Sequence, residues 1–251
     1  MGEARQEARA VAVIPARYGS SRVPGKPLAD IGGRSMIERV LERARLATTV
    51  TRVIVATDDE RIRDVITDGE VVMTDPGHES GSDRVAEVAR ELDCEIVVNI
   101  QGDLPLLDPE LVDELVTTLR DDPSLGLATV AVPIRDAREL EDPSTVKVVC
   151  DGRGRALYFS RAPVPHDRDR PGAFDRALHH VGLYAYRRQT LLEFAKLEPT
   201  ALERTEKLEQ LRALENGMSI GVVVRNGAPP MEVDTADDLA MVREVVAGSD
   251  G

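Results

Sequence analysis

Along the first 145 residues, short apolar runs alternate with stretches in which apolar positions recur every three or four residues. The apolar runs are rich in Val and Ile and predict strands over residues 11–16, 51–57, 70–74, 95–100 and 127–133. The amphipathic stretches predict helices over residues 35–46, 60–67, 82–92 and 109–120. Several of the strands are continuously apolar, as expected for strands that are covered on both faces. This order predicts an α/β fold with a mostly parallel, doubly wound sheet that binds ligands at the carboxyl ends of its strands.

After about residue 146 the pattern changes to closely spaced strand-like segments. These segments span residues 146–150, 156–160 and 180–186. The periodic stretch that follows them predicts one long helix over residues 202–216, and residues 163–176 predict an irregular loop. We therefore expect a smaller β-rich lobe embedded in the α/β core.

The composition is that of a soluble globular protein. A chain of 251 residues with 42% hydrophobic and 31% charged residues can bury the core of one large α/β domain. No internal repeat, low-complexity tract or interdomain linker is evident. We expect a single domain over 1–251, divided into a core over 11–145, the embedded lobe over 146–218 and a return to the core over 219–246.

Charge and cysteine usage limit the partners that we expect. The formal net charge of -13 argues against a nucleic-acid backbone as the ligand. The segment MGEARQEARA has no apolar stretch typical of a secretory signal, and no apolar run reaches transmembrane length. Cys94 and Cys150 have no metal-ligand spacing, so they are expected to be reduced and structural. We expect a cytoplasmic protein with neither a membrane nor a nucleic acid as partner.

The first predicted strand leads directly into a cationic loop, within the sequence VAVIPARYGSSRVPGKPL. Arg17, Arg22 and Lys26 lie in this loop among small residues and two glycines. Backbone N–H groups and fixed positive charge at the end of a strand can bind a nucleotide phosphate. The loop is not a Walker P-loop, because five residues separate Gly19 from Gly25 and a proline follows Lys26. An ordinary basic turn is the remaining alternative.

Two acids follow distant apolar segments. The run EIVVNIQGD ends in Gln101, Gly102 and Asp103, and the later sequence MEVDT contains Asp234. Mg²⁺ is held in such proteins by a few carboxylates together with substrate phosphate oxygens, so Asp103 and Asp234 are candidate ligands. The structural alternatives are a turn acid for Asp103 and an N-cap for Asp234, a role for which Thr235 competes.

The chain resembles the 3-deoxy-manno-octulosonate (Kdo) cytidylyltransferases, also called CMP-Kdo synthetases, from about residue 11 to residue 242. The resemblance is carried, in order, by PARYGSSRVPGKPL, HESGSDR, NIQGD, ALYFSRA, GLYAYRR, EKLEQLRAL and VDTADDL. It implies a Rossmann-like nucleotide-diphospho-sugar transferase fold, CTP as donor, Mg²⁺ dependence and a homodimer built through the second lobe. It also implies in-line attack of the acceptor oxygen on the α-phosphorus of CTP, with diphosphate as the leaving group.

The resemblance also assigns roles to residues. It implies that Arg17, Arg22 and Lys26 bind the triphosphate, that Asp103 and Asp234 hold the metal, and that Ser80, Gly81, Ser82 and Gln101 approach the cytosine. The implied acceptor residues are Arg161, His180, Tyr184, Glu206 and Gln210. Local sequence alone offers other interpretations: residues 80–82 would cap a helix, and His180 would be structural. Glu206 and Gln210 are four residues apart and would share a face of an ordinary surface helix.

Departures from the family pattern concern the acceptor side. Leu104 follows Asp103 where the family motif QGDEP has an acid, and Val164-Pro165-His166 lacks the usual aromatic residue. Three functions therefore remain open. The first is a cytidylyltransferase for Kdo or a related 2-keto-3-deoxy sugar acid, the second uses the same chemistry on a small phosphonate such as phosphonoformate, and the third is a nucleotide-binding protein without turnover.

Overall fold

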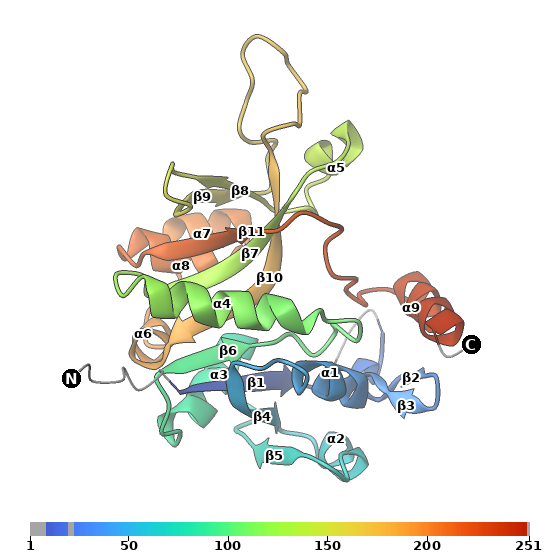
Figure 1. Cartoon of the computed structure of the whole chain (residues 1–251). Coiled ribbons are helices and arrows are strands. Elements are labelled where there is room, and N and C mark those ends of the chain that lie inside the picture. Colours follow the sequence, from blue (N-terminus) through green and yellow to red (C-terminus); the bar gives the residue numbers. More distant parts are fainter. Residues whose placement is uncertain (1–8, 20–22, 250–251) are drawn as a thin grey trace, which may run out of the picture. The chain divides into compact units, whose positions relative to one another are not determined.

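The computed structural model describes residues 9–19 and 23–249, which divide into two units (Figure 1). The first unit comprises Met1–Val116 and Pro230–Gly251, and the second comprises Thr117–Pro229. Within the described parts of the chain, no helix has both the length and the apolar character needed to cross a membrane.

The first unit is built on a parallel sheet with the strand order β6-β1-β4-β5. Its strands are β1 (Ala10–Ala16), β4 (Val50–Thr57), β5 (Glu70–Met73) and β6 (Ile96–Asn99). Strand β1 is central and completely buried, and it pairs in parallel with both β4 and β6. The continuous apolar character of residues 11–14 is therefore explained by neighbours on every side. The parallel α/β fold predicted from the sequence is confirmed.

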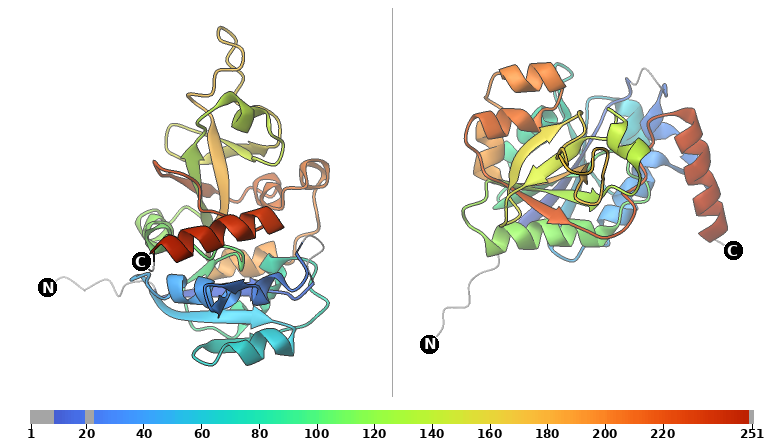
Figure 2. Two further views of the ribbon diagram at one scale, coloured as in Figure 1. Left: turned by 90° about the vertical axis from the view of Figure 1, so that its right-hand side faces the viewer. Right: turned by 90° about the horizontal axis from the view of Figure 1, so that it is seen from above.

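Helices and a short hairpin complete the first unit. They are η1 (Lys26–Leu28), β2 (Asp30–Ile31), β3 (Arg34–Ser35), α1 (Met36–Ala44), α2 (Glu60–Val65), α3 (Gly81–Arg90) and α9 (Ala236–Ser249); α4 (Pro109–Asp121) continues into the second unit. Helix α1 starts at a capping box between Ser35 and Glu38. Leu239 and Val242 of α9 pack against Ile31 in one apolar cluster. Figure 2 shows α9, in red, beside the blue segment that carries α1 and the hairpin.

The second unit is a mixed sheet centred on β7 (Leu127–Pro133). Strand β11 (Ile220–Val224) pairs with β7 in parallel, whereas β10 (Leu178–Arg187) pairs with it antiparallel. The hairpin of β8 (Lys147–Cys150) and β9 (Ala156–Ser160) adds to β10. The helices of this unit are α5 (Ala137–Glu141), α6 (Arg188–Phe194), α7 (Ala201–Glu206) and α8 (Gln210–Glu215). Residues 161–177 contain neither helix nor strand, so the loop predicted over 163–176 is confirmed.

The single helix predicted over residues 202–216 is wrong, because the chain breaks between α7 and α8. Lys207 ends α7 in the left-handed region, with φ 55°. The Arg161 guanidinium donates hydrogen bonds to the carbonyl oxygens of Glu206 (2.7 Å) and Lys207 (3.3 Å), which gives these carbonyls partners outside the helix. Glu206 therefore lies at the end of one helix and Gln210 at the start of the next, so they do not share a helix face.

Candidate active site

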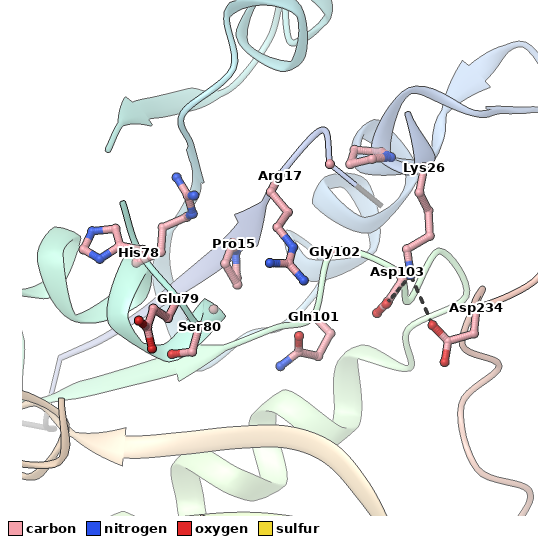
Figure 3. Close-up of a pocket in the computed structure, with 14 residues that line it drawn as sticks. Pro15, Arg17, Lys26, His78, Glu79, Ser80, Gln101, Gly102, Asp103 and Asp234 are labelled. Carbon is pink, nitrogen blue, oxygen red and sulfur yellow. Dashed lines mark hydrogen bonds and ion pairs between the residues drawn. The ribbon is translucent and has the colours of Figure 1, made fainter. Parts of the chain in front are cut away.

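A cavity of about 340 Å³ opens at the carboxyl ends of β1 and β6 in the first unit (Figure 3). Parallel strands leave their last residues at one edge of a sheet, which is where α/β proteins bind ligands. The cavity is lined by Pro15, Arg17, Gly19, Lys26, Pro27, His78, Glu79, Ser80, Gly81, Arg84, Gln101, Gly102, Asp103 and Asp234. The cationic loop and both predicted metal acids therefore face the same space.

Lys26 is the centre of the polar contacts in this cavity. Its Nζ donates hydrogen bonds to Asp103 Oδ2 at 2.7 Å, to Asp234 Oδ1 at 3.3 Å and to the Val233 carbonyl at 2.8 Å. The backbone N–H of Val233 donates to the Asp103 carbonyl at 3.0 Å, which holds the two acidic segments together. Segments from three distant parts of the chain thus place two carboxylates around one ammonium group.

Asp234 is available for this role because another residue caps α9. The Thr235 Oγ1 accepts a hydrogen bond from the Asp238 backbone N–H at 3.2 Å, and Asp238 Oδ2 accepts one from the Thr235 N–H at 2.8 Å. This is a reciprocal capping arrangement. Of the two alternatives that the sequence offered for the N-cap, Thr235 is the one that the structure shows.

Glu232 is a third acid near the pair, and it is not among the site residues predicted from the sequence. The Glu232 residue is exposed, but desolvation of its carboxyl group and the negative charges of Asp103 and Asp234 together raise its pKa to about 7. Its position two residues before Asp234 was the available signal. The local excess of negative charge favours a cation at this end of the cavity.

The residues present fit a magnesium ion. Mg²⁺ is usually bound by one or two carboxylates and completes its shell with water and substrate phosphate oxygens. Asp103 and Asp234 provide such a pair, since both contact the same ammonium group. Among residues 9–19 and 23–249, no group of three or more His, Cys, Asp or Glu side chains has the geometry of a complete metal site.

The cationic loop approaches the cavity from the end of β1. Figure 3 shows the Arg17 side chain extending toward Gln101. A Cβ on Gly102 would lie 2.9 Å from the Pro15 carbonyl oxygen, so the turn after β6 passes too close to β1 for any other residue. Arg22, the remaining predicted phosphate ligand, lies outside the described residues.

The start of α3 forms the opposite wall of the cavity. Ser80 is its N-cap, and its Oγ accepts a hydrogen bond from the Asp83 N–H at 3.1 Å. Gly81 lines the cavity beside Ser80, whereas Ser82 is buried and is not among the lining residues. Local sequence therefore predicted the cap correctly, and the approach of residues 80–82 and Gln101 to a cytosine stays a prediction.

Arg84 is a buried cation in the cavity wall, and it is not among the site residues predicted from the sequence. Its guanidinium donates a hydrogen bond to Thr74 Oγ1 and forms an ion pair of 3.3 Å with Asp58. These partners fix the end of β4 and the strand after it against α3. The nearby His78 is held in a similar way by a hydrogen bond to Glu87.

The predicted acceptor residues lie in the second unit, where Glu206 and Arg161 are tightly bound by their neighbours. Glu206 accepts hydrogen bonds from Ser160 Oγ at 2.7 Å, from the Arg161 N–H at 3.0 Å and from Tyr158 OH at 3.4 Å. Despite the opposing effect of burial, these donors lower the pKa of Glu206, so it is a carboxylate. The Arg161 guanidinium also donates to the Pro143 carbonyl at 2.8 Å, besides the two carbonyls at the break after α7.

His180 and Tyr184 lie in a row of aromatic side chains. The His180 ring packs edge-on against Phe159 and tilted against Tyr184, and its Nε2 is 3.0 Å from Thr129 Oγ1. Burial lowers the pKa of His180 to about 3, so its imidazole is neutral. Gln210 is also buried, at the start of α8. The binding of an acceptor by these residues stays a prediction.

Comparison with known proteins identifies the family. The family model described as "Cytidylyltransferase" matches residues 11–220. The 3-deoxy-manno-octulosonate cytidylyltransferase of Syntrophotalea carbinolica is 50% identical over 247 residues, which cover 94% of this chain and 98% of the relative. The enzyme of the same description from Chromohalobacter salexigens is 51% identical over 252 residues, with 96% and 98% covered.

Solved structures give the same assignment. A structure of CMP:2-keto-3-deoxy-manno-octonic acid synthetase complexed with CTP shares 45% identity with a TM-score of 0.91, and the match covers 96% of this chain and all of that one. A 4-diphosphocytidyl-2C-methyl-D-erythritol synthase from Anaerococcus prevotii, 17% identical with a TM-score of 0.61, shares the fold. The fold and the relatives define an enzyme of the nucleotidyltransferase class. Within that class, the chain belongs to the 3-deoxy-manno-octulosonate cytidylyltransferase family.

Proposed function

We propose that this chain transfers CMP from CTP to 3-deoxy-manno-octulosonate and releases diphosphate. The observation that carries the proposal is the placement of Lys26 between Asp103 and Asp234 at the end of a parallel sheet. The names of relatives with about half of their residues identical support Kdo as the acceptor, and the CTP complex of a structural relative supports the donor. Neither the phosphonate alternative nor the alternative without turnover gains support from these relatives.

Charge neutralisation is the main task of the cavity in this proposal. Arg17 and Lys26, with Arg22 from the same loop, bind the triphosphate and offset the negative charge that develops on the leaving diphosphate. Ser80, Gly81 and Gln101 face the same cavity and provide backbone and amide groups for the cytosine edge. No covalent nucleophile is required, because phosphoryl transfer depends mainly on positioning and on electrostatic stabilisation.

Asp103 and Asp234 are the residues that would hold Mg²⁺. When bound there, the ion would neutralise phosphate oxygens and lower the pKa of the acceptor hydroxyl. In the structure, the Lys26 ammonium group contacts both carboxylates. A cation bound between the carboxylates would replace these contacts, so the ammonium group could then contact a phosphate oxygen.

The acceptor is assigned to the second unit. Arg161, Tyr184, Glu206 and Gln210 belong to motifs on which the family resemblance rests, and His180 lies two residues before one of them. Within that unit, Glu206 is hydrogen-bonded to Arg161, and the His180 ring packs against Tyr184. We assign the homodimer to the same unit, and we assign the protein to the cytoplasm, where CTP is available.

A diphosphate-release assay with a panel of substrates tests the proposal. We expect turnover with CTP and Kdo, several-fold slower turnover with UTP or ATP, and loss of activity after chelation of Mg²⁺. Turnover with phosphonoformate and not with Kdo would overturn the acceptor while leaving the cytidylyl transfer intact. Absence of diphosphate release with every acceptor, despite measurable CTP binding, would favour the protein without turnover.

A further inference from the structure

An arginine outside the cavity stacks on the loop that carries the phosphate-binding cations. The Cζ of Arg61 lies 3.3 Å from the centroid of the Tyr18 ring. Tyr18 directly follows Arg17 in the cationic loop, whereas Arg61 lies in the first turn of α2. A guanidinium over the face of an aromatic ring at this distance makes an attractive cation–π contact.

Asp59 fixes the guanidinium in that position. Its Oδ1 accepts a hydrogen bond from Arg61 Nε at 2.9 Å, and its Oδ2 accepts one from Nη2 at 2.6 Å. The same carboxylate caps α2 by accepting from the Arg61 backbone N–H at 2.9 Å. Because two nitrogens along one edge of the planar group are bound, the stack on Tyr18 costs little further side-chain entropy.

The Tyr18 ring also contacts the far end of the loop. A Cβ on Gly25 would lie 3.2 Å from Tyr18 OH and 3.3 Å from its Cε2, so the ring packs directly on this glycine. Gly25 has φ 66° and directly precedes Lys26. Tyr18, which directly follows Arg17, therefore packs against Gly25, which directly precedes Lys26. Neither Tyr18 nor Arg61 is among the residues that line the cavity.

We propose that Arg61 and Tyr18 are positioning residues that hold Arg17 and Lys26 at the separation required to bind the CTP triphosphate. The inference rests on the function proposed above, and it adds two residues that contact no substrate. Loss of the stack frees the two ends of the loop to move relative to each other. CTP then binds more weakly, because the two cations must be ordered each time the triphosphate binds.

The test compares Arg61→Ala with Arg63→Ala. Both arginines are on α2, and their side chains are 58% and 42% exposed; Arg63 forms ion pairs with Glu60 and Asp64. For Arg61→Ala we expect a KM for CTP raised roughly two- to fivefold, as follows from a cation–π contact at an exposed site. We expect kcat, the KM for Kdo and the melting temperature to stay near wild type. Arg63→Ala should leave all four quantities unchanged.

Tyr18 supplies the second arm of the test. Tyr18→Phe keeps the ring and should retain the wild-type KM for CTP, whereas Tyr18→Leu should match Arg61→Ala, and the double variant should be no worse than either single variant. An unchanged KM for CTP in Arg61→Ala, or equal losses in Arg61→Ala and Arg63→Ala, would overturn the proposal.

Equilibrium binding of CTP separates this inference from the proposed function. If the wild type binds CTP and releases no diphosphate with any acceptor, the proposed function fails, and a weaker CTP affinity of Arg61→Ala still supports the positioning role. If the wild type does not bind CTP at all, both proposals fail.

Discussion

The charged side chains of the two predicted sites differ in their partners. In the first unit, Lys26, Asp103 and Asp234 share one set of contacts and remain partly exposed, with side-chain exposures of 17%, 25% and 38%. In the second unit, Glu206 and Arg161 are each bound by several groups of the protein itself. Two carboxylates on one ammonium leave acceptor capacity for a further cation, whereas Glu206 already accepts three hydrogen bonds.

The difference in partners has different consequences for ligand affinity and for the stability of the fold. A polar group that is incompletely satisfied by its own protein gains contacts when a charged ligand arrives. A group that already has its partners mainly holds the backbone in place, as Arg161 does at the break between α7 and α8. Substitution of Asp103 or Asp234 should therefore reduce activity more than stability, and substitution of Arg161 should reduce both.

The largest effect is expected at the two carboxylates of the first unit. Asp103→Asn and Asp234→Asn should each lower kcat by a factor on the order of 100 or more, because each removes a negative charge from the metal site. The melting temperature should change little, since both side chains are partly exposed. Steady-state kinetics at saturating Mg²⁺ and thermal unfolding measure the two quantities.

Asp237→Asn is the matched control for these variants, since Asp237 is an exposed acid in the first turn of α9. It should retain normal kcat. A normal rate in either Asp103→Asn or Asp234→Asn would remove that residue from the metal site.

Arg161→Ala should affect stability as well as activity. It deletes the donors to three carbonyl oxygens and should lower the free energy of unfolding by about 1–3 kcal/mol. Arg17→Ala should instead reduce activity at constant stability. Chemical denaturation of both variants, with Arg168→Ala in the exposed loop as control, measures the difference. Equal stability of Arg161→Ala and wild type would show that the network does not hold the helix break.

The buried histidine of the second unit should make stability depend on pH. Burial lowers the pKa of His180 to about 3, whereas an unfolded histidine has its ordinary value of about 6.5. The unfolded state therefore binds the proton more readily, and the stabilisation is complete above pH 6.5 and is lost progressively as the pH falls toward 3.

Between pH 7 and pH 5, His180 should account for about 2 kcal/mol of the loss in unfolding free energy. His180→Gln, which cannot titrate, should show a correspondingly weaker pH dependence in denaturant titrations. His166→Gln, in the exposed loop, should follow the wild type. An identical pH dependence of His180→Gln and wild type would contradict a buried neutral imidazole.

The strands and the centre of the site were predictable because their signals are local. Continuous apolar runs marked β1 and β6, and the rule that ligands bind at carboxyl strand ends brought Lys26 and Asp103 to one edge. Leu104 is completely buried, which explains why an apolar side chain is accommodated where the family pattern has an acid.

The helix break was not predictable because its cause lies far away in the sequence. Nothing in residues 202–216 signals an end at Lys207, which is a good helix former; the carbonyl partners come from Arg161. The same holds for Arg61, whose partner Tyr18 is on another element. Local patterns predict elements and strand ends, whereas contacts between distant side chains depend on how those elements pack.

The smallest expected effect is at Ser80, where the structural role and the predicted nucleotide role can be separated. Ser80→Ala removes the N-cap of α3 and should cost about 1 kcal/mol of unfolding free energy. Ser80→Asp preserves a capping oxygen but places a negative charge in the wall of the cavity, so it should keep most of the stability and raise the KM for CTP. If Ser80→Asp binds CTP as tightly as the wild type, Ser80 acts as a helix cap alone, and nucleotide recognition at this wall falls to Gly81 and Gln101.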